Sequence, residues 1–299
     1  MEILLLKIPF FLLLMIALFV PQNDGKVESK NILVVSIFGS KSMKQFYEPL
    51  LHALANRGHK ITALTPFKSL KPNANIRDII GTDMTEDEEF KKNNMFKMRM
   101  EGALMNPLSM TPILEKSCRE FYKKEEIQEI LNTKFDLILS TYTFNECGFG
   151  LIHKLGVPFI LMHANVPMPF NNPTGVPFPL SYIPFPFFGF SDKMSFGQRF
   201  VNFGFANLFG LVDSLYRVSK MERIYRDALG DDIPGASEIA RNVSLIFANS
   251  HFSVNYPRPT MPTLVEVGGM HCTEPKPLPQ VSKHFHMYLI YQNLQYYKI

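Results

Sequence analysis

The stretch Asn31-Ile-Leu-Val-Val-Ser-Ile-Phe38 decides the fold class of this chain. It is almost continuously apolar and rich in β-branched residues, which is typical of a strand buried on both faces of a parallel sheet. The loop Gly39-Ser40-Lys41 follows it. Ser42 and Gln45 then form a capping-box pattern, which predicts the start of a helix.

A helix and a second strand follow, and they complete a first βαβ unit. Phe46, Leu50 and Leu54 recur at helical spacing on one face, and Pro49 is expected to kink the helix. Gly58 occupies the position of a helix-ending glycine. The run 60–65 is then typical of the next strand.

Strand patterns recur farther along the chain. They occupy residues 135–140, 157–161, 243–248 and 263–267, the last followed by Gly268-Gly269. A helix from Asn145 to Leu155, ending at Gly156, separates the first two strands, and residues 86–131 look helical. Strands that alternate with helices predict a doubly wound α/β fold with a Rossmann-like parallel sheet.

The stretch from His163 to Phe190 breaks this alternation. It is rich in proline and phenylalanine and carries almost no charge. So much proline excludes regular structure, and the apolar character is unusual for an exposed loop. Two interpretations stay open: the segment packs over the core of the sheet, or it forms a surface for a ligand or a membrane.

Composition narrows the class of protein. The 299 residues carry 31 Lys and Arg against 27 Asp and Glu, a net charge of +4, without a block of like charges. No nucleic-acid partner is therefore expected. The 27 Phe, 22 Pro and 16 Met indicate a protein that handles apolar molecules or touches a membrane. The cysteines form no C-x-x-C pair, which excludes a disulfide scaffold and a zinc ribbon. They are Cys118, Cys147 and Cys272.

The N-terminus predicts the compartment. Residues 3–20 are apolar except for Lys7, which fits the hydrophobic region of a signal peptide over residues 1–25 better than a spanning helix. An uncleaved signal anchor is the alternative. Both direct the chain into the secretory pathway, where the sequon Asn242-Val243-Ser244 becomes the expected glycosylation site. Because Asn242 starts the strand expected over 243–248, the strand could hide it.

Few motifs suggest chemistry. Ligands of an open parallel sheet bind beyond the carboxyl ends of its strands, where loops 38–43, 141–145, 162–167 and 268–271 are expected. The first glycine of a phosphate loop and the G-x-S-x-G elbow are both missing from the sequence. His284-x-His286 lacks a third ligand, so no metal site is expected. His163 ends a strand at the relevant edge and is the histidine best placed for acid–base chemistry.

Three stretches resemble animal UDP-glycosyltransferases, the UDP-glucuronosyltransferase group, and most of all insect-type members. They are residues 51–62, residues 135–160 and the segment from Asn249 to His271, which contains Tyr256-Pro-Arg-Pro259 and Val265-Glu-Val-Gly-Gly-Met-His271. The likeness covers roughly residues 28–280. It implies the N-terminal, acceptor-binding domain of a GT-B glycosyltransferase, in the lumen of the endoplasmic reticulum. That family acts on small lipophilic acceptors, with a UDP-sugar as co-substrate and no other cofactor.

The departures from the family concern catalysis. Family members have a catalytic histidine after the first strand, and the matching position here is Met43. The carboxylate that orients this histidine aligns with Thr141. A thioether does not accept a proton at neutral pH, so neither member of the catalytic pair is intact. Glu146 is nearby in sequence, on the following helix. The residues expected to line an acceptor pocket are Phe38, Gly39, Met43, Thr141, Phe144 and His163.

The C-terminal region departs further. Residues 281–299 do not resemble the family's interdomain linker, and neither its UDP-sugar-binding domain nor its membrane helix is found in this sequence. Three explanations for this region stay open: a truncated gene model, an alternative terminal exon, or a genuine short isoform. Two functions follow: a glycosyltransferase by descent that is inactive alone, or a non-catalytic acceptor-binding or regulatory partner of full-length relatives. Contact with a membrane surface is a further expectation.

Overall fold

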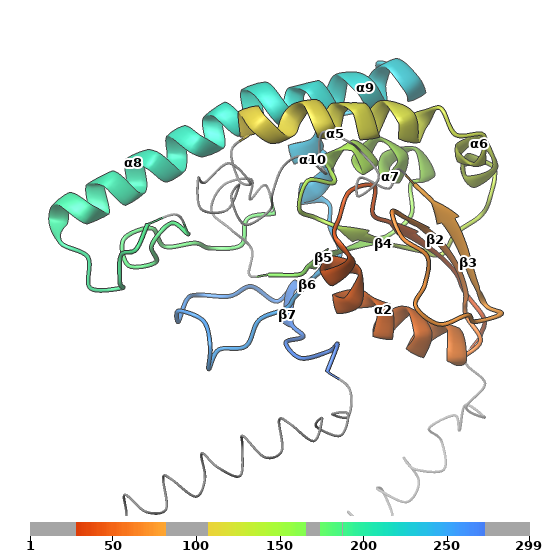
Figure 1. Ribbon diagram of the computed structural model, residues 1–299, viewed down its shortest axis with the longest axis horizontal. Helices are drawn as coiled ribbons and strands as arrows, with labels where there is room; N and C mark the ends of the chain where they lie inside the picture. The colour runs from red at the N-terminus through yellow and green to blue at the C-terminus, as the bar shows by residue number, and fades with distance from the viewer. Residues whose placement is uncertain (1–27, 82–106, 166–173, 187, 273–299) are drawn as a thin grey trace, which may run out of the picture.

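The computed structural model describes residues 28–81, 107–165, 174–186 and 188–272. Within them, seven strands form one parallel sheet in the order β3-β2-β1-β4-β5-β6-β7 (Figure 1). The strands are β1 (Asn31–Val35), β2 (Lys60–Thr65), β3 (Ile76–Ile80), β4 (Leu137–Thr141), β5 (Phe159–His163), β6 (Leu245–Ala248) and β7 (Leu264–Glu266). The prediction of a Rossmann-like α/β fold is confirmed.

Helices cover both faces of the sheet. They are α2 (Lys41–Asn56), α5 (Pro107–Tyr122), α6 (Glu126–Leu131), α7 (Phe149–Leu155), α8 (Phe196–Asp213), α9 (Ser219–Leu229) and α10 (Ala236–Arg241), with the 3₁₀ turn η3 (Glu146–Gly148) and the π-helical segment η4 (Ser214–Val218). Helix α2 covers one face, while α5, α7, α9 and α10 cover the other (Figure 1). None of the helices in the described ranges is long and apolar enough to span a membrane.

Strand β1 is buried on both sides, as its continuous apolar run predicts. Leu33 and Val35 face the larger core, whereas Ile32 and Val34 face α2. The strand nevertheless ends at Val35, earlier than the expected Phe38. The reason is that the backbone of Phe38 hydrogen bonds to the side chain of Asn145 instead of to a neighbouring strand.

The start of α2 differs from the sequence prediction. Ser40, not Ser42, is the N-cap: its backbone is extended, and its Oγ accepts a hydrogen bond from the Met43 N–H at 3.3 Å. Ser42 lies in the first turn with its Oγ 2.8 Å from that of Ser40. Pro49 lies inside the helix, which continues to Asn56.

Other elements agree with the sequence or add to it. Helix α7 ends where Gly156 adopts a left-handed conformation (φ 63°), as expected. Helices α5 and α6 confirm the helical character of residues 107–131, while residues 86–106 lie outside the described ranges. Strand β3 was not foreseen.

His163, the first residue of the proline- and phenylalanine-rich segment, ends β5, and the segment has no helix or strand in its other described parts, residues 164–165, 174–186 and 188–190. The interpretation that the segment packs over the core of the sheet holds for part of it. Val176 is buried against β6 and β7, whereas Phe185 packs against Phe205 and Phe209 of α8. Part of the segment therefore covers the sheet, and part forms an aromatic cluster with a helix that extends beyond the sheet (Figure 1).

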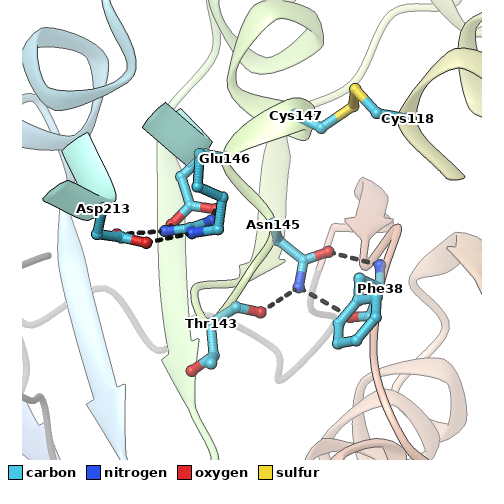
Figure 2. Close-up of polar contacts among 8 residues, drawn as sticks. Phe38, Cys118, Thr143, Asn145, Glu146, Cys147 and Asp213 are labelled. Carbon is cyan, nitrogen blue, oxygen red and sulfur yellow. Dashed lines mark hydrogen bonds and ion pairs between the residues drawn. A yellow bond between two sulfur atoms is a disulfide. The ribbon is translucent and has the colours of Figure 1, made fainter. Parts of the chain in front are cut away.

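A disulfide between Cys118 and Cys147 joins α5 to η3 (Figure 2). The two residues are 29 positions apart, and both are buried. Cys272 is exposed and free. The cysteine pattern excluded a disulfide scaffold but did not reveal this single bridge, because its spacing matches no local motif.

Replacement of both bridged cysteines by serine should lower the free energy of unfolding. Closing a loop of this length restricts the unfolded chain, an effect of roughly 3 kcal/mol. Urea denaturation of the double variant Cys118→Ser/Cys147→Ser measures the loss, with Cys272→Ser as the matched control. Equal stability of the two variants would contradict the structural role of the bridge.

Candidate functional site

The carboxyl edge of β1 and β4 is the switch point of the sheet. From β1 the strand order proceeds through β2 and β3 to one side, and through β4 to β7 on the other. Ligands of such sheets bind in the crevice that opens where the order reverses. The six residues expected to line an acceptor pocket lie at the carboxyl ends of β1, β4 and β5 or in the segments that follow them.

Asn145 ties the loop after β1 to the loop after β4. Its Oδ1 accepts a hydrogen bond from the Phe38 N–H at 2.9 Å, and its Nδ2 donates to the Phe38 carbonyl at 2.8 Å (Figure 2). Nδ2 also donates to the Thr143 carbonyl at 2.8 Å. The side chain is fully buried and uses both functional atoms. The relative position of the two loops is therefore fixed.

Two aromatic rings stand at this edge. Phe38 and Phe144 meet edge to face, with ring centroids 5.7 Å apart. Phe144 has a left-handed backbone (φ 60°), which is unusual for a bulky residue and is held by the interactions around it. The guanidinium of Arg217 lies 5.2 Å from its ring centroid. Phe38 is buried, whereas Phe144 is partly exposed, so the ring of Phe144 is the apolar surface that the pair presents.

Met43 lies in the first turn of α2 and is partly exposed. Its sulfur approaches Gly39 closely: a Cβ added to Gly39 would lie 3.8 Å from Met43 Sδ. The two residues are thus neighbours at the crevice. A thioether here adds apolar surface but no proton acceptor.

Hydroxyl groups occupy the buried end of β4. Thr141 Oγ1 donates a hydrogen bond to Ser36 Oγ at 2.9 Å, and Tyr47 also hydrogen bonds to Ser36. Burial raises the pKa of the Tyr47 phenol above its ordinary value. Ser140 Oγ donates to the Val35 carbonyl at 3.1 Å. None of these four hydroxyl groups is a base near neutral pH.

His163 lies at the end of β5, as expected, but it is only 4% exposed. Its ring packs against that of Tyr142, with centroids 4.3 Å apart. Burial, with a smaller contribution from Arg258, lowers the pKa of His163 to about 3. The imidazole is therefore neutral at pH 7 and a very weak proton acceptor, which argues against general-base catalysis by this residue.

Glu146 is engaged in a buried ion cluster. Arg217 donates to its carboxylate through Nη1 at 2.5 Å and Nη2 at 3.0 Å, and to Asp213 through Nε at 2.5 Å and Nη2 at 2.7 Å (Figure 2). Burial alone would lower the pKa of Arg217, but the two carboxylates raise it. Burial raises the pKa of Asp213. Both oxygens of Glu146 are therefore engaged by Arg217 in a structural ion pair.

Sequence reasoning missed Asn145, Ser36 and Arg217. Asn145 precedes a helix and looks like an ordinary N-cap, although its side chain bonds to a distant loop. Ser36 was a polar residue inside an apolar run. Arg217 and Asp213, four residues apart in an otherwise apolar region, were the available signal for a buried pair.

The expected glycosylation site is accessible. Asn242 is the exposed C-cap of α10, and Ser244 is also exposed. Strand β6 begins at Leu245 and not at Val243, so the sequon precedes the strand. The concern that a strand hides Asn242 is thus removed.

Helix α8 carries a second surface of interest. Large apolar side chains along it, and one in η4, are 36–87% exposed. They are Phe196, Phe200, Val201, Phe203, Phe205, Leu208, Leu211, Val212 and Leu215, which we call the apolar stripe. Arg199 is the only charged residue between Phe196 and Val212. So much exposed apolar surface on one helix marks an interaction site.

Comparisons with known proteins agree with the fold. A family model described as UDP-glucoronosyl and UDP-glucosyl transferase matches residues 30–287, which ends within the stretch 281–299 that was expected to diverge. UDP-glucosyltransferase 2 of Dactylopius coccus is 30% identical over 92% of this chain and 54% of its own length. UDP-glucuronosyltransferase 2A3 of Cavia porcellus is 29% identical over 79% of this chain and 48% of its own.

The chain spans about half the length of the curated relatives it matches. The matched region includes every described strand of the sheet and the whole switch-point edge. The chain belongs to the family of UDP-glucoronosyl and UDP-glucosyl transferases.

Proposed function

We propose that this chain is an acceptor-binding half of a UDP-glycosyltransferase, which binds small lipophilic molecules at the switch-point crevice. The observation that carries the proposal is the partly exposed ring of Phe144, which packs on the buried ring of Phe38 where Asn145 fixes the two loops and where such sheets bind ligands. Met43 and Gly39 extend this surface. The printed names of the relatives, glucosyl- and glucuronosyltransferases, support a sugar-transfer context.

The chain alone is not expected to transfer a sugar. Deprotonation of an acceptor hydroxyl needs a base, and Met43 and Thr141 supply none. His163 and Glu146, the remaining candidates at this edge, are respectively a buried weak base and a fully paired anion. The proposed role is therefore to bind acceptors, or to regulate full-length relatives by pairing with them.

Replacement of Phe144 by alanine should weaken binding of 1-naphthol by about tenfold, because the ligand loses an aromatic contact worth roughly 1 kcal/mol and a share of buried area. Equilibrium dialysis measures the affinity. Phe252→Ala is the matched control, since Phe252 is 74% exposed and lies in the loop after β6. Unchanged affinity in Phe144→Ala would contradict the site. Turnover is tested by adding UDP-glucose to the same samples and measuring glycoside formation. Any glycoside formed would refute the non-catalytic role.

We also propose that the chain acts in the lumen of the endoplasmic reticulum. The apolar residues 3–20 support entry into the secretory pathway, and a buried disulfide is typical of an oxidising compartment.

Exposure of Asn242 provides the test of this location. After expression in insect cells, the chain should migrate faster once its N-glycan is removed enzymatically, and Asn242→Gln should abolish that shift. The control is Asn172→Gln, because proline follows Asn172 and excludes its use as a sequon. An unmodified wild-type chain would count against lumenal location.

The apolar stripe supports the further proposal that α8 contacts a membrane surface. Leu208→Gln/Leu211→Gln should reduce flotation with phosphatidylcholine vesicles at least about tenfold, because two apolar side chains no longer enter the bilayer. Leu70→Gln/Val254→Gln changes two apolar side chains outside α8 that are even more exposed, and serves as control. Equal loss in both variants would show that the stripe is not the contact.

A further inference from the structure

A groove lies between α8 and the proline- and phenylalanine-rich segment. It has a volume of about 290 Å³, and its walls are almost entirely apolar. The lining residues are Leu180, Ser181, Phe196, Arg199, Phe200 and Phe203. Three of them belong to the apolar stripe, so the groove opens onto the surface that we propose contacts a membrane.

The walls of this groove are held in place. Asn202, buried on the inner side of α8, donates through Nδ2 to the carbonyls of Leu180 (2.8 Å) and Ile183 (3.0 Å). Its Oδ1 accepts from the Phe185 N–H at 2.6 Å. One side chain thereby fixes the loop to the helix. The groove is a formed feature of the fold and not a gap between loose segments.

Arg199 gives the groove its charge. Its Nε donates to the Met194 carbonyl at 3.0 Å, which anchors the guanidinium at the margin of the groove. Within the ranges that the structure describes, its two Nη atoms have no hydrogen bond or ion pair. Asp192 and Lys193 are exposed in the preceding turn and balance each other. A guanidinium with free Nη atoms beside an apolar groove suits a ligand with a phosphate or carboxylate and an alkyl chain.

The surroundings favour a bilayer as the source of this ligand. The stripe runs from Phe196 to Leu215, about 28 Å of helix at 1.5 Å per residue. Over that length it presents no acidic side chain to solvent, because Asp213 is buried and bonded to Arg217. A protein partner would require polar groups at the margin to fix its orientation, whereas fluid acyl chains require none.

We propose that this groove binds an anionic phospholipid, with an acyl chain against Phe196, Phe200 and Phe203 and the phosphate or carboxylate of the headgroup on Arg199. The inference rests on the proposed membrane contact of α8 and adds a preference for lipid charge. A single basic residue near an anionic surface strengthens binding by about fivefold.

A tryptophan reporter makes the test local. The chain has no tryptophan, so Phe200→Trp in the full-length chain introduces a single fluorophore at the wall of the groove, within the apolar stripe. Titration uses brominated phosphatidylcholine vesicles with and without phosphatidylserine. We expect quenching at about fivefold lower lipid concentration on the anionic vesicles. Arg199→Gln in the reporter chain should remove this preference.

Arg57→Gln is the matched control, because Arg57 is an exposed arginine at the opposite end of α2 from the crevice. It should preserve the preference. Equal quenching on both vesicle types, or a preference that survives in Arg199→Gln, would overturn the proposal. Quenching by monomeric brominated fatty acid without vesicles would also overturn it, since the ligand source would then be soluble. Flotation without quenching would refute the groove and the stripe as the contact, while leaving acceptor binding at the switch point untouched.

Discussion

The side chain of Asn145 is the interaction on which the candidate site depends. It satisfies both backbone groups of Phe38 and thereby replaces the sheet hydrogen bonds that β1 would otherwise continue. A buried amide with every partner in place is stabilising, whereas loss of the amide would leave the polar backbone of Phe38 unsatisfied. The loops after β1 and β4 therefore keep one relative position. The contact of Phe38 with Phe144 follows from that position.

Local sequence pattern was sufficient to predict the sheet. Strands β1, β4, β5 and β6 are short apolar runs, and burial on both faces of a parallel sheet produces that pattern without reference to distant residues. Strand β3 was not predicted, because Arg77 and Asp78 interrupt its apolar pattern. It lies at the edge of the sheet. The ends of strands were less predictable. Ser36, for example, belongs to an apolar run in sequence, but its hydroxyl bonds to Thr141, which is 105 residues away.

The site was only partly predictable for the same reason. The six proposed lining residues could be placed by strand order, because carboxyl ends of parallel strands share one edge. Their accessibility could not, since it depends on packing across the sheet: His163 and Thr141 are buried, while Met43 and Phe144 are partly exposed. The bridge from Cys118 to Cys147 and the pair of Glu146 with Arg217 join segments that only the folded chain brings together.

The ion cluster around Arg217 links α8 to the turn after β4, and it also engages the carboxylate of Glu146. A buried arginine is tolerated only when its charge is paired, and here two carboxylates surround it. Arg217 lies in the π-helical segment η4, Asp213 at the end of α8 and Glu146 in η3, so the cluster joins the end of α8 to the turn that follows Phe144. The same bonds engage both oxygens of Glu146. The guanidinium that lies against the ring of Phe144 thus also occupies the carboxylate of Glu146, so one residue positions a ring of the candidate site and keeps a carboxylate in an ion pair.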